Sequence, residues 1–403
     1  MKEILVTEPQ LFSDFSCIGS TCKEHCCAHW KIVFDKKTVS RYLNSKDIEV
    51  RNIASHAIEV TKKNISHWGY VKLDEKTGAC PFLNSSNLCT VHSNLGAKAL
   101  STTCSTYPRQ TRYYQNERQH TLNLSCPQVS KLLITSPNAM SFKQQTLLQS
   151  KFYDAPIIDV SAKLVQLLCL NILNSSFGTV EEQLYAIVKL SMLVEKMDVI
   201  KDQDVHKLMG YYEQLLSDLN NGDMRVELYN LRVRNDIKAN LISAVYGYFK
   251  ASASVRGRKV LSHYLKGLSE CCELENDSQI FPPEKILFVD LCWEKYCKPW
   301  FDDNDSVLRN IISYKFWQSA YPQKNGRSIL SNLYLIVAEY YFMKVLFSIG
   351  AHQAEGLNDD LIVEVLYSFH SLSQHSPVAS ENFHRMISAI NLNDNLSLIH
   401  LLK

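Results

Sequence analysis

Eight of the thirteen cysteines of this chain lie in its first third, and they constrain the fold of that region more than any other feature. The eight are Cys17, Cys22, Cys26, Cys27, Cys80, Cys89, Cys104 and Cys126. Several have the short spacings that allow neighbouring thiolates to bind one ion, and others follow turn-rich segments, which direct a side chain inward. The pattern predicts a metal or iron–sulfur site that holds together an irregular N-terminal domain.

The expected cellular compartment decides how these cysteines are interpreted. The N-terminus lacks the charged and apolar regions of a signal peptide, and the longest apolar run, 333–347, is too short and too charged to span a membrane. We therefore expect a soluble, cytoplasmic protein without membrane contact. In a reducing cytosol, clustered cysteines are more often ligands than disulfides. The adjacent Cys26 and Cys27 also fit a disulfide framework poorly, and plain buried thiols are the other interpretation.

The spacing of the cysteines bears on the kind of metal. The early group contains no Cys-x2-Cys pair, which zinc sites commonly use. Iron–sulfur clusters bind four cysteines at more scattered spacings, so they fit at least as well, although eight thiolates exceed the needs of one four-iron cluster. The nearby His25, His29 and His92 are further candidate ligands, but a packing or hydrogen-bonding role is favoured for each.

The chain has 403 residues, enough for two or three domains, and 46% of them are hydrophobic. We expect a mainly α fold, in which a small cysteine-rich α+β domain over residues 1–135 precedes an all-α helical body over residues 136–403. In the first domain the pattern predicts the following elements: strands over 30–34 and 69–73, a helix over 46–67, a helix from Ser93 to Cys104, and a hairpin around Asn116 and Glu117.

Beyond residue 135, helical periodicity dominates the sequence. It predicts helices over 162–173, 180–199, 205–219, 237–251, 307–319, 328–347, 360–369 and 381–390. Thr179 and Glu182 form a predicted capping box at the start of one of them. Cys169 is expected to lie in the core, and Glu339, within an apolar helix, is expected to meet a structural partner such as a lysine.

Two further groups of residues allow a functional and a structural interpretation. Cys271, Cys272, Cys292 and Cys297 form a later group, for which a helical core with incidental thiols is favoured over a metal site. Arg109, Arg112 and Arg118 alternate with tyrosines, as in some nucleic-acid surfaces. A solvated hairpin face is favoured for them, because the formal net charge is only +2, and no nucleic-acid partner is expected.

Several motifs of enzymes are absent from the sequence. No glycine-rich turn of the dinucleotide-binding type follows a strand, and there is no phosphate-binding loop, no nucleophile elbow and no His-Glu-x-x-His. The residues alone therefore assign no catalytic residue and no organic cofactor site. They define a protein with a cysteine-ligated metal domain and a helical body.

Four pieces of the first domain, taken together, resemble the flagellin lysine N-methylase family of bacteria. They are Phe15-x-Cys17-x4-Cys22-x3-Cys26-Cys27-x2-Trp30, Cys80-Pro81-Phe82-Leu83, Leu88-Cys89-x-Val91-His92 and Leu100-Ser101-x2-Cys104-x2-Tyr107-Pro108-Arg109. The resemblance implies a methyltransferase that acts on lysine ε-amino groups of flagellin with S-adenosylmethionine as donor. It also implies a [4Fe-4S] cluster on the eight cysteines, with zinc as the alternative.

The spacing departs from the pattern of radical S-adenosylmethionine enzymes, because Cys27 follows Cys26 directly. Polar methyl transfer is therefore the expected chemistry. The alternative function is a non-enzymatic metal-binding module with a helical interaction body. A nucleic-acid-binding zinc protein is a third hypothesis, which predicts salt-dependent binding to nucleic acid.

Overall fold

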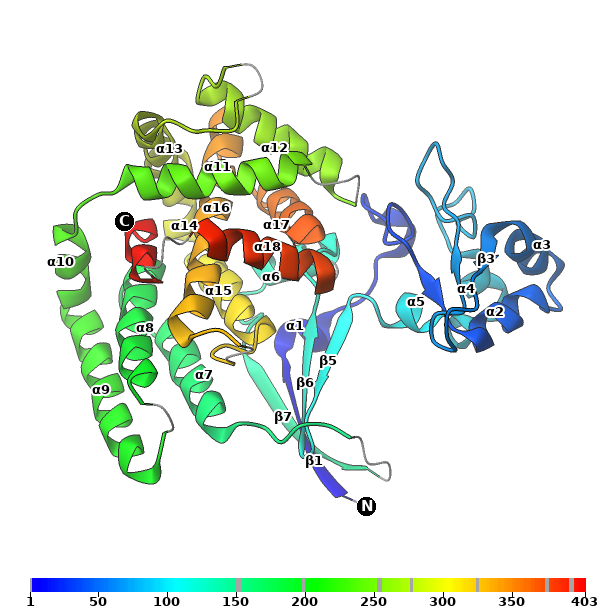
Figure 1. The fold of residues 1–403 in the computed structure, drawn as a ribbon, viewed down its shortest axis with the longest axis horizontal. Coiled ribbons are helices and arrows are strands. Elements are labelled where there is room, and N and C mark those ends of the chain that lie inside the picture. Colours follow the sequence, from blue (N-terminus) through cyan, green and yellow to red (C-terminus); the bar gives the residue numbers. More distant parts are fainter. Residues whose placement is uncertain are drawn as a thin grey trace.

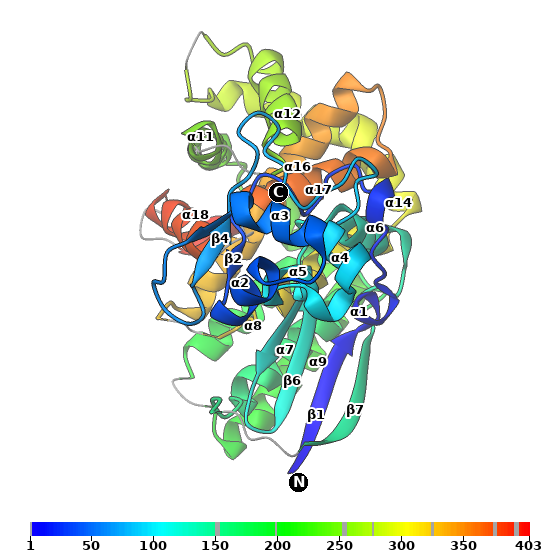
Figure 2. The same cartoon turned by 90° about the vertical axis from the view of Figure 1, so that its right-hand side faces the viewer.

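The computed structural model describes residues 2–149, 154–197, 200–251, 256–275, 278–323, 326–373, 377–390 and 395–403. A large helical body carries a sheet at its lower edge, and a small lobe stands to one side (Figure 1). Turned by 90°, the lobe faces the viewer in front of the body (Figure 2). The chain begins in the sheet, crosses into the lobe, and returns to the sheet before it builds the helices of the body.

The strands in the described part form two sheets. The larger sheet has the order β5-β6-β1-β7, with β1 parallel to β6 and antiparallel to β7. The smaller sheet, β2-β4-β3, is antiparallel and belongs to the lobe. The strands are β1 (Lys2–Pro9), β2 (Val33–Phe34), β3 (Ile58–Val60), β4 (Gly69–Val71), β5 (Arg109–Tyr113), β6 (Glu117–Leu122) and β7 (Phe142–Gln149).

Helices make up most of the chain, so the predicted mainly α class with a small α+β part is confirmed. The first group is α1 (Gln10–Asp14), α2 (Lys36–Leu43), α3 (Ile48–Ala57), α4 (Thr90–Leu95), α5 (Thr102–Thr106) and α6 (Pro127–Thr135). The body contains α7 (Val160–Leu173), α8 (Val180–Glu195), α9 (Asp202–Asn221), α10 (Asp223–Asn230), α11 (Asn235–Ala251), α12 (Arg258–Cys271), α13 (Ile286–Cys292), α14 (Lys298–Asp303), α15 (Ser306–Gln318), α16 (Ile329–Gln353), α17 (Asp359–Ser373) and α18 (Pro377–Ile390).

All the helices predicted for the body are present, and their bounds differ from the prediction by a few residues. The helix predicted over 180–199 is α8, which ends at Glu195, and positions 198–199 lie outside the described residues. The capping box is confirmed, because Thr179 and Glu182 each bond the other's backbone N–H. The sequence pattern missed α10, α12 and the α13–α14 region.

Two predictions for the first domain are wrong. The helix expected over 46–67 ends at Ala57, and the chain continues into β3. Its isoleucines do not form one face, since Ile48 and Ile65 are 65% and 75% exposed. The helix expected from Ser93 to Cys104 is interrupted at Gly96, which has a φ of +79°. The hairpin around Asn116 is confirmed as β5 and β6.

The buried side chains form two cores. The lobe core consists of residues between Ile32 and Ala99. The larger core includes Leu11, Phe15 and Leu122, which flank the lobe in the sequence, together with the helices of the body. The core of the body therefore includes chain segments that precede the lobe in the sequence and segments that follow it. The division predicted at residue 135 stays a prediction.

Helix α16 runs through the centre of the body. Within the described residues it is the one helix long and apolar enough to cross a membrane, since it has 25 residues. The apolar run predicted to be too short is thus part of a longer helix. However, 94% of its most apolar window is buried inside the protein. Its apolar surface is therefore used for packing against other helices.

Candidate metal centre

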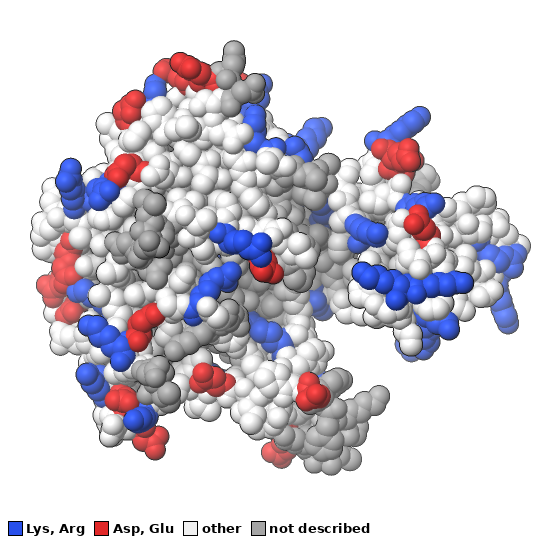
Figure 3. Space-filling view, viewed as in Figure 1, with Lys and Arg blue, Asp and Glu red and all other residues white. Residues whose placement is uncertain are grey.

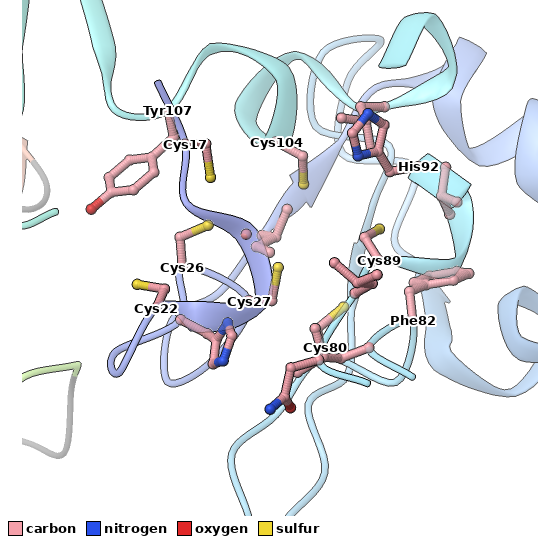
Figure 4. Close-up of a pocket in the computed structure, with 18 of the residues that line it drawn as sticks. Cys17, Cys22, Cys26, Cys27, Cys80, Phe82, Cys89, His92, Cys104 and Tyr107 are labelled. Atoms are coloured by element: carbon pink, nitrogen blue, oxygen red, sulfur yellow. The ribbon is translucent and has the colours of Figure 1, made fainter. Parts of the chain in front are cut away.

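All eight early cysteines line one cavity of about 200 Å³ at the junction of the lobe and the body. They come from the loop before β2, the segment between β4 and α4, the helix α5 and the N-terminus of α6. Figure 4 shows seven of them with their sulfur atoms around this space. Among the described residues, no three His, Cys, Asp or Glu side chains lie close enough to coordinate a single ion.

Four of these cysteines belong to the lobe. Cys80 is buried in the lobe core, and the other three pack against that core. The sulfur atoms of the four face a common space in Figure 4. Ser101 helps to place one of them, because its side chain caps α5 by accepting a hydrogen bond from the Cys104 N–H, at 3.1 Å. We call this group the lobe set, which consists of Cys27, Cys80, Cys89 and Cys104.

The other four cysteines lie toward the body. Cys126 is the N-cap residue of α6 and is part of the body core. Cys22 and Cys26 interact electrostatically with Arg256, which precedes α12, and so does Cys126. Cys17 is exposed at the edge of the cavity. We call this group the junction set, which consists of Cys17, Cys22, Cys26 and Cys126.

Arg256 brings a buried positive charge to the cavity from the body. Its side chain is 1% exposed, and it donates hydrogen bonds to the Tyr107 hydroxyl at 2.5 Å and to the Glu24 carbonyl at 2.6 Å. Its Nε has no hydrogen-bond partner, and no carboxylate of the described residues forms an ion pair with it. The Glu24 carboxylate lies close by, where it accepts a hydrogen bond from the Gly257 N–H at 3.1 Å, and Cys26, whose pKa is lowered, is the junction thiol that can add negative charge.

The burial of the cavity keeps most of these thiols protonated. It raises the pKa of Cys80 to about 12 and that of Cys104 and of Cys126 to about 11. Cys26 behaves differently: a hydrogen bond from Cys27 lowers its pKa to about 6 and raises the pKa of Cys27. A bound metal ion would reverse the effect of burial, because it deprotonates a coordinating thiol.

The donor set therefore fits a thiolate-bound centre. One zinc ion needs its sulfur ligands at about 2.3 Å, which brings the sulfur atoms themselves close together. An iron–sulfur cluster binds each thiolate at a different iron atom, so its ligands lie further apart around a larger space. The eight cysteines that line the cavity supply sulfur, the ligand atom that both kinds of centre use.

The histidines singled out in the sequence take different positions. His25 and His92 line the cavity. His29 lies beside Gly78, where a Cβ atom would meet its ring at 2.2 Å, and the His29 N–H donates to the Gly78 carbonyl. This contact explains the need for glycine at position 78, which also has a φ of +69°.

The expectation of a solvated hairpin face holds for Arg109, which is exposed, whereas Arg112 and Arg118 are half-buried. Arg109 donates to the Phe15 carbonyl at 3.2 Å, Arg112 donates to the Trp317 carbonyl, and Arg118 donates to the Gln149 side chain. The three arginines thus fasten the hairpin to other elements. Lys, Arg, Asp and Glu are interspersed over the face of the body shown in Figure 3.

The remaining predictions for buried residues are confirmed. Cys169 is fully buried in α7. Glu339 pairs with Lys315 of α15, as expected for a structural carboxylate. Of the later cysteines, three are buried in the helical body and Cys271 is half-buried. No sequence signal marks Arg256 as buried, because a single arginine in a polar segment forms no pattern.

The fold and the cavity define a mainly α protein with a cysteine-lined centre where a small lobe meets a helical body. Comparison with known proteins gives the family. Residues 166–401 match the model of the FliB lysine N-methylase C-terminal domain. The chain is 39% identical to the Lysine-N-methylase of Salmonella choleraesuis and 38% identical to that of Salmonella typhimurium, each over the full length of both chains.

A shorter relative matches less of the chain, but with higher identity. The Flagellar biosynthetic protein FliU of Salmonella muenchen is 48% identical over 158 residues, which are 38% of this chain and 94% of that protein. No solved structure matches the chain. The chain belongs to the FliB lysine N-methylase family, and it is a protein-lysine N-methyltransferase. The alternative of a non-enzymatic metal-binding module is therefore wrong.

Proposed function

We propose that this methyltransferase acts on flagellin, uses S-adenosylmethionine as the methyl donor, and holds a [4Fe-4S] cluster on its early cysteines. The observation that supports the cluster is that all eight early cysteines line one cavity. The flagellar substrate is supported by the names of two relatives, the flagellar biosynthetic proteins FliU and FliV of Salmonella muenchen. A cytoplasmic location is part of the proposal, because thiols stay reduced there.

The lobe set is the proposed ligand group, with Cys27, Cys80, Cys89 and Cys104 facing one space. When bound, the cluster would supply a redox-active iron centre and thiolate–iron bonds that link the loop before β2 to α5 and to the segment between β4 and α4. The junction set, with Arg256, lies on the body side of the same cavity.

The proposed reaction is a direct transfer of the methyl group. The lone pair of the neutral lysine nitrogen forms the new N–C bond while the S–C bond of the donor breaks. The electron pair of that bond returns to sulfur, so S-adenosylhomocysteine leaves and the methylated nitrogen carries a proton to be lost. The lysine must be neutral and in line, and therefore desolvation and positioning supply most of the rate.

Mass spectrometry of flagellin tests the whole proposal. Flagellin is incubated with the iron-loaded protein and S-adenosylmethionine that carries a labelled methyl group, and labelled methyl-lysine is expected. The control is the same mixture with S-adenosylhomocysteine as competitor. If flagellin stays unlabelled while another protein is labelled on lysine under the same conditions, flagellin is rejected as the substrate, but the methyltransferase activity is retained.

Arg256 provides a test of the cluster that does not depend on activity. Replacing Arg256 by glutamine removes a buried positive charge beside the cysteines, and we expect the reduction potential of the bound cluster to become more negative, because positive charge stabilises the reduced form. The matched control is Arg118→Gln, since that arginine contacts Gln149 on the sheet. A redox titration followed by absorbance measures the shift. Equal reduction potentials in the two variants would contradict the placement of the cluster in the cavity beside Arg256.

A further inference from the structure

A second cavity, of about 1030 Å³, lies in the helical body. Its lining residues are contributed by α8, α10, α11, α13, α14, α15 and α16 and by the C-terminal residues. In Figure 1 the C-terminus lies among these helices, and α10 stands at the end of the body opposite the lobe. Nearly all of the lining belongs to residues 166–401, the segment that the family model matches.

The sizes of the two cavities separate their roles. Ligand pockets for small molecules usually have volumes of about 300–1,000 Å³. The cysteine-lined cavity, at about 200 Å³, is smaller than this range and is lined by the candidate ligands of a metal centre. The second cavity has enough volume for an organic ligand as large as the proposed donor. By volume, the second cavity is therefore the better fit for the donor.

The inner wall of this cavity holds a buried hydroxyl without a partner. Tyr341 of α16 is 4% exposed and lines the cavity, and its hydroxyl makes no hydrogen bond. Next to it, Lys238 is 1% exposed and donates to Asp290 at 2.9 Å, and its Nζ lies 5.6 Å from the centre of the Tyr341 ring. A buried hydroxyl that makes no hydrogen bond is unfavourable, and a ligand oxygen would satisfy it.

A second lysine extends this wall. Lys344, one turn further along α16, lies 4.2 Å from the centre of the Trp293 ring and pairs with Glu181 at 2.5 Å. Trp293 and Glu294 lie in a π-helical turn, Trp293–Cys297, between α13 and α14. Such turns occur frequently at functional sites. Each of the two ammonium groups already faces one carboxylate, Asp290 or Glu181, so the group of the inner wall that has no partner is the Tyr341 hydroxyl, which can donate a hydrogen bond to a ligand carboxylate.

At the rim of the cavity, two carboxylates share one lysine. Glu294 and Asp302 are 62% and 68% exposed, and both lie 3.9 Å from the same Lys298, so one ammonium faces two carboxylates. The excess of negative charge is local to these three residues, since Arg225 and Arg309 also line the cavity and pair with Glu182 and Asp305, and it favours a cationic ligand group at this part of the opening. A ligand with a carboxylate at one end and positive charge nearby would match the inner wall and the rim together.

The geometry points to this cavity as the binding site of the methyl donor, with the carboxylate of its amino-acid end at Tyr341 and Lys238 and its positive groups toward Glu294 and Asp302. This assignment rests on the function proposed above. It also places the entry of the substrate lysine at the acidic rim. The cluster then lies outside the donor site, since the two cavities share no lining residue.

Calorimetric titration with S-adenosylhomocysteine tests the site in the full-length protein. Tyr341→Phe removes a hydroxyl that has no partner in the folded protein, so we expect unchanged stability together with roughly tenfold weaker binding, the effect of one lost hydrogen bond to a charged group. Glu294→Gln, on the exposed rim, is expected to weaken the binding of S-adenosylmethionine more than the binding of S-adenosylhomocysteine, because only S-adenosylmethionine carries the sulfonium charge. The matched control is Tyr334→Phe, a buried tyrosine of the same helix outside the cavity.

The outcomes separate this inference from the proposed function. Weaker binding by Tyr341→Phe and normal binding by Tyr334→Phe support the site. Tight binding of S-adenosylhomocysteine to wild type and equally tight binding to the Tyr341 and Glu294 variants would overturn the site while leaving the donor assignment intact. If wild type binds neither S-adenosylmethionine nor S-adenosylhomocysteine, the donor assignment itself fails, and the site fails with it.

Discussion

Replacing Cys104 by serine is expected to remove most of the iron from the anaerobically purified protein. Cys104 belongs to the lobe set, whose four sulfur atoms face one space, and a hydroxyl is a much poorer ligand for iron than a thiolate. Even the loss of a group that only supports a metal ligand lowers metal affinity about 10–100-fold, so the loss of a ligand should lower it at least as much. The same result is expected for Cys80→Ser.

Two further variants make this prediction specific. Cys169→Ala changes a cysteine buried in α7, outside the cavity, and should retain full iron and sulfide. Cys17→Ser changes an exposed member of the junction set and should also retain them. Iron and acid-labile sulfide are measured per chain, and about four iron atoms are expected in the wild type. Full iron in both Cys104→Ser and Cys80→Ser would refute the lobe set as the ligand group.

The sequence predicted the helical body well, because each helix there carries its own periodic pattern and several carry caps. The capping box of Thr179 and Glu182 is an example in which two side chains define a helix start locally. The first domain was harder to predict. β1 is held by β6 and by β7, whose residues follow more than a hundred positions later, and neither pairing has a local signal.

The sequence indicated which cysteines lie together but not how they are arranged, and their role as metal ligands stays a prediction. The concentration of eight cysteines in the first third of the chain marked them as one group, and all eight line the cavity. Their division into two sets depends on the path of the chain, which leaves the body before Cys17 and returns to it before Cys126. Arg256 reaches the cavity from the turn before α12, far from the cysteines in the sequence, so no pattern near the cysteines indicates it.

A buried charged network is the other feature with a large expected effect. Glu339 of α16 and Lys315 of α15 are each about 2% exposed and form an ion pair in the centre of the body. His384 of α18 contacts the second oxygen of Glu339 at 3.1 Å, and His370 lies 3.4 Å from the Lys315 Nζ. Burial lowers the pKa of His370 to about 3, so this imidazole stays neutral beside the ammonium.

The pH dependence of this network follows from Glu339. Burial alone would raise the pKa of its carboxyl, but Lys315 and His384 outweigh burial and hold the pKa at about 2, below the ordinary value of 4.5. A group with a lowered pKa in the folded state stabilises the protein fully above its ordinary pKa. This contribution is lost as the pH falls from about 4.5 toward about 2.

Replacing Glu339 by alanine is therefore expected to destabilise the protein by about 3–5 kcal/mol, because it leaves the Lys315 ammonium buried without its partner. The matched control is Glu381→Ala, which removes an exposed partner of Arg385 and should change stability by about 0–1 kcal/mol. Urea unfolding at pH 7 measures both. The double variant Lys315→Met with Glu339→Leu should recover most of the loss, since apolar side chains replace a buried ion pair without leaving a lone charge. A Glu339→Ala protein as stable as the Glu381→Ala control would show that Lys315 finds another partner or releases its proton when the carboxylate is absent.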